Sequence, residues 1–196
     1  MAYDSFKVLR SSAVPLPIEN VDTDQIIPAR FLKATERKGF GDNLFRDWRF
    51  DKNDQPKSDF VLNNPTYSGK ILVGGKNFGS GSSREHAAWA IYDYGFRCVV
   101  SSFFADIFRG NSINVGILPV QVSPEFLHQI FTEIEKDPKA ELEVSLPEQT
   151  ITIVSTGAFE SFQINGYKKH NLLNGFDDID YLQAMKDEIA TFALNR

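Results

Sequence analysis

The stretch from Lys70 to Gly95, KILVGGKNFGSGSSREHAAWAIYDYG, decides how this chain folds. Its apolar run at Ile71–Val73 predicts a buried strand, because a short apolar run bounded by turn residues is typical of one. A glycine-rich turn follows the run. The next apolar residues recur at helical spacing, which predicts a helix ending at Gly95: Ala87, Ala90, Ile91 and Tyr94.

The residues that enter this helix are suited to binding an anion. Ser82, Ser83 and Arg84 stand where the first N–H groups of a helix lack partners and the helix dipole is positive. A guanidinium there can hold a carboxylate with two hydrogen bonds. The structural alternative is a capping box, in which Ser82 and Glu85 only cap the helix. The neighbouring glycines, which let a ligand approach the backbone, favour the anion site.

Two nucleotide-binding motifs are excluded by the residues of the turn. A phosphate-binding P-loop requires a lysine directly after its second glycine, and none follows Gly79 or Gly81 in that way. A dinucleotide fingerprint that starts at Gly79 would require glycine where Arg84 stands.

Composition narrows the class of protein. The net charge of the 196 residues is −5 and no basic block occurs, which argues against a nucleic-acid partner. The N-terminal residues lack the apolar core of a signal peptide, and no apolar run is long enough to span a membrane. The single cysteine, Cys98, indicates a reducing compartment, so we expect a cytoplasmic protein without a membrane partner. One thiol also cannot hold an iron–sulfur cluster, which usually takes several.

The rest of the chain predicts one α/β domain over residues 1–196, with mixed sheets and packed helices. Residues 33–64 show no clear period, and we interpret them as an insertion that packs partly on its own domain and partly on a ligand or partner. Strands are expected at 6–14, 71–73, 97–101, 117–122, 142–146, 151–153 and 159–164. A helix is expected at 103–113, with Phe104, Ile107 and Phe108 as its core face. Two more helices are expected to begin at Ser123 and at Asp177 or Asp178. The last helix is expected to bury an apolar face made of Ile179, Leu182, Met185, Ile189 and Phe192.

Three segments carry a resemblance to a known family. They read NVDTDQIIP at Asn20–Pro28, GSGSSREHA at Gly79–Ala87, and SFFADIFR at Ser102–Arg109, with GILP behind the last at Gly116–Pro119. In this order they resemble the motifs of the aconitase superfamily. Length, insertion and terminal helix are similar to those of the bacterial small subunits in the leucine-biosynthesis branch. One departure is Ser80, where many relatives carry cysteine.

The resemblance implies a swivelling β/β/α domain of the aconitase C-terminal type, which closes over a large subunit. In that family the large subunit holds a 4Fe-4S cluster through three cysteines, so no metal or cluster is expected on this chain. The implied reaction is that of a hydro-lyase: dehydration and rehydration of a dicarboxylate, converting 2-isopropylmalate to its 3-isomer through an alkene.

The resemblance also assigns roles to residues. Ser82 matches the family's base and Arg84 the group that binds a substrate carboxylate, while Ser83 would hydrogen-bond the substrate. Asp24 matches an aspartate near the active site and is expected to bind substrate. Hydrogen bonding within the loop is the structural alternative for both Asp22 and Asp24.

A further substrate-binding arginine follows this motif in the family. Arg30 and Arg37 are the candidates, and we expect Arg37 to bind substrate. For His86, one turn into the helix, we favour a structural role.

Two other functions stay open on sequence grounds. The chain could be the small subunit of a related hydro-lyase acting on citraconate, dimethylmalate or homoaconitate. It could also be a non-catalytic module that binds dicarboxylates alone, and its partner would then need no iron–sulfur cluster.

Overall fold

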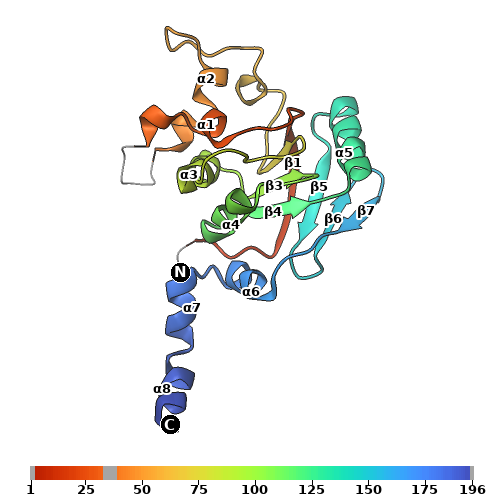
Figure 1. Ribbon diagram of the computed structural model, residues 1–196. Helices are drawn as coiled ribbons and strands as arrows, with labels where there is room; N and C mark the ends of the chain where they lie inside the picture. The colour runs from red at the N-terminus through yellow and green to blue at the C-terminus, as the bar shows by residue number, and fades with distance from the viewer. Residues whose placement is uncertain (1–2, 33–38, 195–196) are drawn as a thin grey trace.

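A computed structural model describes residues 3–32 and 39–194 and contains one seven-stranded sheet (Figure 1). The strand order is β4-β3-β2-β1-β5-β6-β7. β1 runs parallel to β2 and antiparallel to β5, so it divides a parallel half from an antiparallel half. The strands are β1 Val8–Leu16, β2 Ile71–Gly74, β3 Cys98–Ser101, β4 Leu118–Gln121, β5 Glu141–Ser145, β6 Thr150–Ile153 and β7 Phe159–Ser161. The predicted mixed α/β class is confirmed, and all its strands join a single sheet.

The burial of each strand follows from what covers it. All four residues of β2 and of β3 are buried, as expected for parallel strands with helices on both faces. β5 and β6 instead alternate between buried and half-buried residues, with Leu142, Val144, Ile151 and Ile153 inside. This alternation identifies the antiparallel half as covered on one face.

Two hydrophobic cores lie on opposite faces of the sheet. One core contains Ile71 and Val73 with the apolar stripe of α5 and Leu172 of α6. The other contains Leu72 and Val99 with residues of α1, α3 and α4. The helices are α1 Thr23–Ile26, α3 Glu85–Tyr94, α4 Asp106–Asn114, α5 Pro124–Lys136, α6 Gly166–Asn174, α7 Asp178–Ala184 and α8 Lys186–Leu194, with a short 3-10 turn, η1, at Ala29–Phe31.

The part of the insertion that the structure describes is packed and locally helical. It contains the short helices η2 (Gly41–Asn43), α2 (Arg46–Arg49) and η3 (Val61–Asn63), and buries Phe40, Leu44 and Phe45 in the second core. The half-buried Arg49 guanidinium ties the segment together by donating to the Leu44 carbonyl at 3.2 Å and to Asn63 Oδ1 at 3.3 Å. The described part of the insertion therefore packs on the second core of the domain.

Two predicted boundaries were wrong for identifiable reasons. β1 continues through Pro15, where the sequence predicted its end. Pairing with β5 stops at Ser12, so the lack of an N–H at Pro15 costs no hydrogen bond to β5. α4 begins at Asp106 rather than Phe103, because the backbone at Phe103 and Ala105 is hydrogen-bonded to Phe78. Ile107 is consequently exposed. Phe104 and Phe108 are buried as predicted, but only Phe108 belongs to the helix, because Phe104 lies in the segment before it.

The C-terminal region differs most from expectation. α6 was not predicted, because its sequence, GYKKHNLLN, carries few apolar residues. The predicted terminal helix is divided at Met185 into α7 and α8, which extend away from the sheet (Figure 1). The prediction of a buried apolar face here is wrong, since Ile179, Leu182, Ile189 and Phe192 are all exposed. Within the described residues, no helix has both the length and the apolar character needed to cross a membrane.

Candidate active site

Three loops follow the carboxyl ends of three adjacent parallel strands. Residues 20–24 follow β1, residues 76–84 follow β2, and residues 102–105 follow β3. Carboxyl ends of parallel strands meet at one edge of a sheet, where ligand sites commonly lie. The three segments that carried the family resemblance are therefore brought together by the strand order.

The glycine-rich loop is bonded on one side to the loop after β1. The N–H of Gly79 donates to the carbonyl of Val21 at 2.7 Å, and the N–H of Thr23 donates to the carbonyl of Ser80 at 2.9 Å. Asp22 and Ser80 form an isolated parallel bridge. The two motifs thus extend the pairing of β1 and β2 beyond the strands.

On its other side the glycine-rich loop is bonded to the loop after β3. The N–H of Phe78 donates to the carbonyl of Phe103 at 3.0 Å, and the N–H of Ala105 returns a bond of 3.1 Å to Phe78. The ring of Phe78 meets that of Phe108 edge-on, with centroids 5.4 Å apart. The central loop is consequently held from both sides, which fixes the backbone that carries the serines.

Gly79 makes this close packing possible. Its φ is +78°, a left-handed conformation, and a Cβ at this position would lie 2.1 Å from Cγ of Phe108. Gly81, at φ +90°, turns the chain toward the helix. These two glycines therefore serve the turn and its packing on α4.

Ser82 and Ser83 are exposed, and Arg84 is the N-cap residue of α3, with its side chain 18% exposed. The three side chains can thus be reached from solvent. The capping box, which was the structural alternative for Ser82 and Glu85, is not formed, because α3 begins at Glu85 and no side chain caps it. Ser82 instead stands three residues before the helix, in a segment bonded to α1.

Asp24 forms an ion pair with Arg84, in which Nη1 donates to Oδ1. A guanidinium carries five N–H donors, so a bond to Asp24 still allows Arg84 to hold a substrate carboxylate. The neighbouring Asp22 has the structural role: it caps α1 through a reciprocal capping box with Gln25, at 2.8 and 2.9 Å. Asp22 thus stabilises the start of α1, whereas Asp24 pairs with the guanidinium of Arg84.

Thr23 is the residue of this site that the sequence analysis missed. Its side chain is buried, at 2% exposure. Its Oγ1 donates to the main-chain carbonyl of Ser82 at 2.9 Å and lies 3.5 Å from the Ser82 hydroxyl. The sequence signal that could have identified Thr23 is its position between Asp22 and Asp24 in the motif Asn20–Pro28.

The remaining candidates are Arg30, Arg37 and His86. Arg30 is bonded to Asp47 through both terminal nitrogens, and this hydrogen bonding lowers the pKa of the Asp47 carboxyl. Arg37 lies outside the described residues. The ring of His86 lies against that of Trp89 in a tilted arrangement, with centroids 4.5 Å apart.

Cys98 is fully buried in β3, and burial raises the pKa of its thiol. The metal ligand is the thiolate, which a raised pKa disfavours. Cys98 therefore does not fit the role of an iron ligand.

Comparisons with known proteins agree with this geometry. Residues 3–125 match the model of the aconitase C-terminal domain family. The chain is 63% identical over 189 residues, 96% of its length, to the 3-isopropylmalate dehydratase small subunit of Cytophaga hutchinsonii, of which the match covers 94%. It is 60% identical over 193 residues to that of Christiangramia forsetii, covering 98% of this chain and 94% of the relative.

A solved structure is also similar. The crystal structure of 3-isopropylmalate dehydratase from Methanocaldococcus jannaschii superposes with a TM-score of 0.69 at 27% identity, covering 94% of this chain and 98% of that one. The expected resemblance is confirmed, and with it the aconitase C-terminal type of fold. The chain belongs to the aconitase C-terminal domain family and, within it, to the 3-isopropylmalate dehydratase small subunits.

Proposed function

We propose that this chain is the small subunit of a 3-isopropylmalate dehydratase. Together with a large subunit it isomerises 2-isopropylmalate to 3-isopropylmalate, a step of leucine biosynthesis. The observation that carries the proposal is the exposed pair Ser82 and Ser83 beside Arg84, whose guanidinium is paired with Asp24. Relatives at 60% identity or more that bear this name support it.

Ser82 is the proposed base. The reaction requires removal of a weakly acidic proton next to a carboxylate, and a serine hydroxyl is a poor base unless its anion is stabilised. Two groups that follow Ser82 closely in the chain are proposed to favour the anion: the positive end of α3, which begins at Glu85, and the guanidinium of Arg84. The bonds that hold the loop on both sides keep Ser82 in position for the transfer.

Arg84 and Ser83 are the proposed contacts for a substrate carboxylate. Arg84 supplies charge-assisted hydrogen bonds, and the exposed Ser83 hydroxyl supplies another donor. Asp24 holds the guanidinium in place and thereby orients it. Arg37 stays a proposed substrate contact on family resemblance.

The Lewis acid of the reaction is proposed to be a 4Fe-4S cluster held by the large subunit. Its chemistry, when bound, is to help hydroxide leave the substrate. The buried position of Cys98 supports placing the cluster on the partner. We also propose a cytoplasmic location, which the reducing compartment inferred from a single unpaired cysteine supports.

The test is reconstitution of the enzyme from purified subunits under anaerobic conditions. The chain is mixed with the large subunit of the same organism, and alkene formation from 2-isopropylmalate is followed by ultraviolet absorbance. Ser82→Ala is expected to lower kcat by about 10³-fold, whereas Ser83→Ala, a matched hydroxyl deletion, is expected to act mainly on KM.

Three outcomes would contradict the proposal at different points. Full turnover by Ser82→Ala would remove Ser82 as the base. A reconstituted original enzyme that converts citraconate, dimethylmalate or homoaconitate in place of 2-isopropylmalate would instead change the substrate assignment. Binding of a dicarboxylate by the chain without any large subunit would favour the non-catalytic module.

A further inference from the structure

The C-terminal arm, defined as residues 178–194, carries an apolar stripe that the described part of the chain leaves exposed. Ile179, Leu182 and Ile189 are 61%, 54% and 49% exposed. Large apolar side chains repeated along one side of a helix are typical of a face that packs on another element. The two helices follow one another closely, since the N–H of Ile189 donates to the Met185 carbonyl at the junction. The arm extends away from the rest of the domain (Figure 1), and these three stripe residues are exposed to solvent.

The base of the arm is firmly attached to the domain. Asp178 accepts hydrogen bonds from the Tyr167 hydroxyl at 2.7 Å and from Lys168 Nζ at 3.2 Å. The hydroxyl of Tyr3 donates to the Phe176 carbonyl at 2.6 Å, and burial raises the pKa of Tyr3, which keeps it a donor. Asp177 caps α7 by accepting from the N–H of Asp180. These bonds fix the direction in which the arm leaves the domain.

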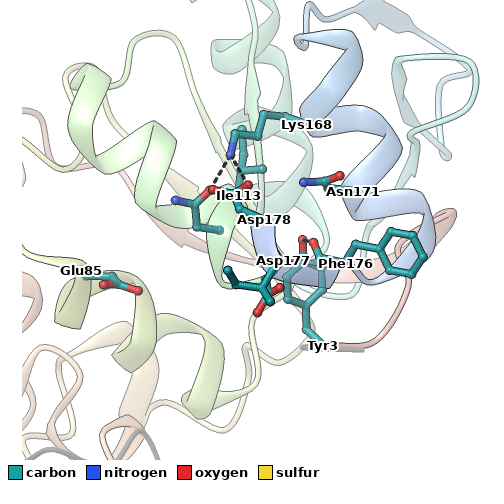
Figure 2. A pocket seen from close by; sticks show the side chains of 10 residues that line it. Tyr3, Glu85, Ile113, Lys168, Asn171, Phe176, Asp177 and Asp178 are labelled. Carbon is teal, nitrogen blue, oxygen red and sulfur yellow. Dashed lines mark hydrogen bonds and ion pairs between the residues drawn. The ribbon is translucent and has the colours of Figure 1, made fainter. Parts of the chain in front are cut away.

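The base of the arm also lies close to the candidate active site. A cavity of about 190 Å³ is lined by Glu85, the residue after Arg84, and by residues 176–179 at the start of the arm. Figure 2 shows Glu85 across this cavity from Asp177 and Asp178. A partner that covers Ser82 and Arg84 therefore lies next to the arm as well.

The charge of the arm favours a basic partner over a second copy of this chain. Residues 178–194 hold four carboxylates and one lysine: Asp178, Asp180, Asp187, Glu188 and Lys186. Two copies of the arm, each on a chain of net charge −5, would bring like charges together at their interface.

We propose that the C-terminal arm docks on the large subunit, in an apolar groove whose rim carries lysine or arginine. This inference rests on the proposed function, which requires a large subunit over the serine face. The stripe of the arm then completes a core shared by two chains, and the arm positions the partner relative to Ser82.

Binding of the purified large subunit to the full chain tests this proposal. A stripe variant, Leu182→Glu with Ile189→Glu, is compared with a matched control, Ala184→Glu with Thr191→Glu. Each control residue is exposed and follows its stripe residue by two positions, about 200° around the helix, and adds the same charge. The stripe variant is expected to bind on the order of tenfold more weakly or worse, because buried large side chains dominate interface energy. The control is expected to bind as tightly as the original chain, or more tightly.

A charge-reversal variant tests the basic rim separately. Asp187→Lys with Glu188→Lys is expected to weaken association at low ionic strength, and the difference is expected to shrink as salt is added. Tighter binding by this variant would contradict a basic rim.

Two further outcomes would overturn the proposal. Equal affinity of the stripe variant and the original chain would show that the arm does not contact the large subunit. Sedimentation of the isolated chain as a dimer that only the stripe variant dissociates would identify a second copy as the occupant. Failure of the proposed function is separate, because then the original complex itself would not isomerise 2-isopropylmalate.

Discussion

The buried hydroxyl of Thr23 donates a 2.9 Å hydrogen bond to the main-chain carbonyl of Ser82, and the two hydroxyl oxygens lie 3.5 Å apart. Thr23 belongs to the loop after β1 and Ser82 to the loop after β2, so this bond joins two segments 59 residues apart in sequence. It fixes the backbone on which the proposed base stands.

Replacing Thr23 by valine removes this bond while keeping the shape of the side chain. We expect Thr23→Val to lower kcat of the reconstituted enzyme by about tenfold with little change in KM, because misplacement of the base affects the chemical step. The unfolding free energy is expected to fall by about 1 kcal/mol. Thr23→Ser keeps the hydroxyl and is expected to restore kcat. Wild-type kcat in the valine variant would show that Thr23 does not position Ser82.

Asp24 and Asp22 provide a matched pair for testing the ion pair at Arg84. Asp24→Asn removes the charge that holds the guanidinium, and KM for 2-isopropylmalate is expected to rise by about tenfold. Asp22→Asn keeps an N-cap side chain on α1 and is expected to leave KM unchanged. Steady-state kinetics of both variants check this expectation, and an equal KM in the two would contradict it.

Gly79 is expected to tolerate no side chain. Gly79→Ala combines the strain of a left-handed residue, about 1–2 kcal/mol, with the overlap on the Phe108 ring, about 1–3 kcal/mol. Gly157→Ala is the control, because Gly157 has φ +73° and open space around it, so only the strain applies. Urea unfolding of both variants measures the difference, and equal losses of stability would show that the loop moves away from α4 without cost.

The pKa of Asp178 predicts acid sensitivity at the base of the arm. The hydrogen bond from Tyr167, followed by that from Lys168, lowers this pKa below its ordinary value of 3.8. A carboxyl with a lowered pKa in the folded state stabilises the fold above pH 3.8, and this contribution is lost as the pH falls through the lower folded value.

Asp178→Asn is therefore expected to cost about 0.5 kcal/mol at pH 7, since the Asp178 carboxylate is more than half exposed, and less near pH 2. Urea unfolding at both pH values measures it. Asp187→Asn, an exposed carboxylate of α8, is the control. A cost that is the same at both pH values would contradict an ionic origin.

Much of the fold could be predicted because its signals are local. Period-two alternation identified the strands that became β5 and β6, and Ser123 followed by proline identified the start of α5. α6 was missed because its helix rests on a capping Asn165 and a few tertiary contacts, which leave little apolar periodicity. The local pattern of a capping box at Ser82 is not realised, because α3 begins at Glu85 and Ser82 lies three residues before it.

The sequence by itself determined the α/β class, the family, and the serines and arginine proposed for the chemistry, because each depends on residue types at fixed spacing. Only the tertiary structure decided that Thr23 holds Ser82 and that Asp24 pairs with Arg84. Those contacts arise because β1, β2 and β3 are neighbours in the sheet. The order of strands in a sheet cannot be predicted from the sequence of any one strand. The exposure of Ile179, Leu182 and Ile189 was likewise decided in three dimensions. Helical spacing predicts which side chains share one face of a helix. Whether another part of the same chain packs on that face depends on the path of the chain in three dimensions.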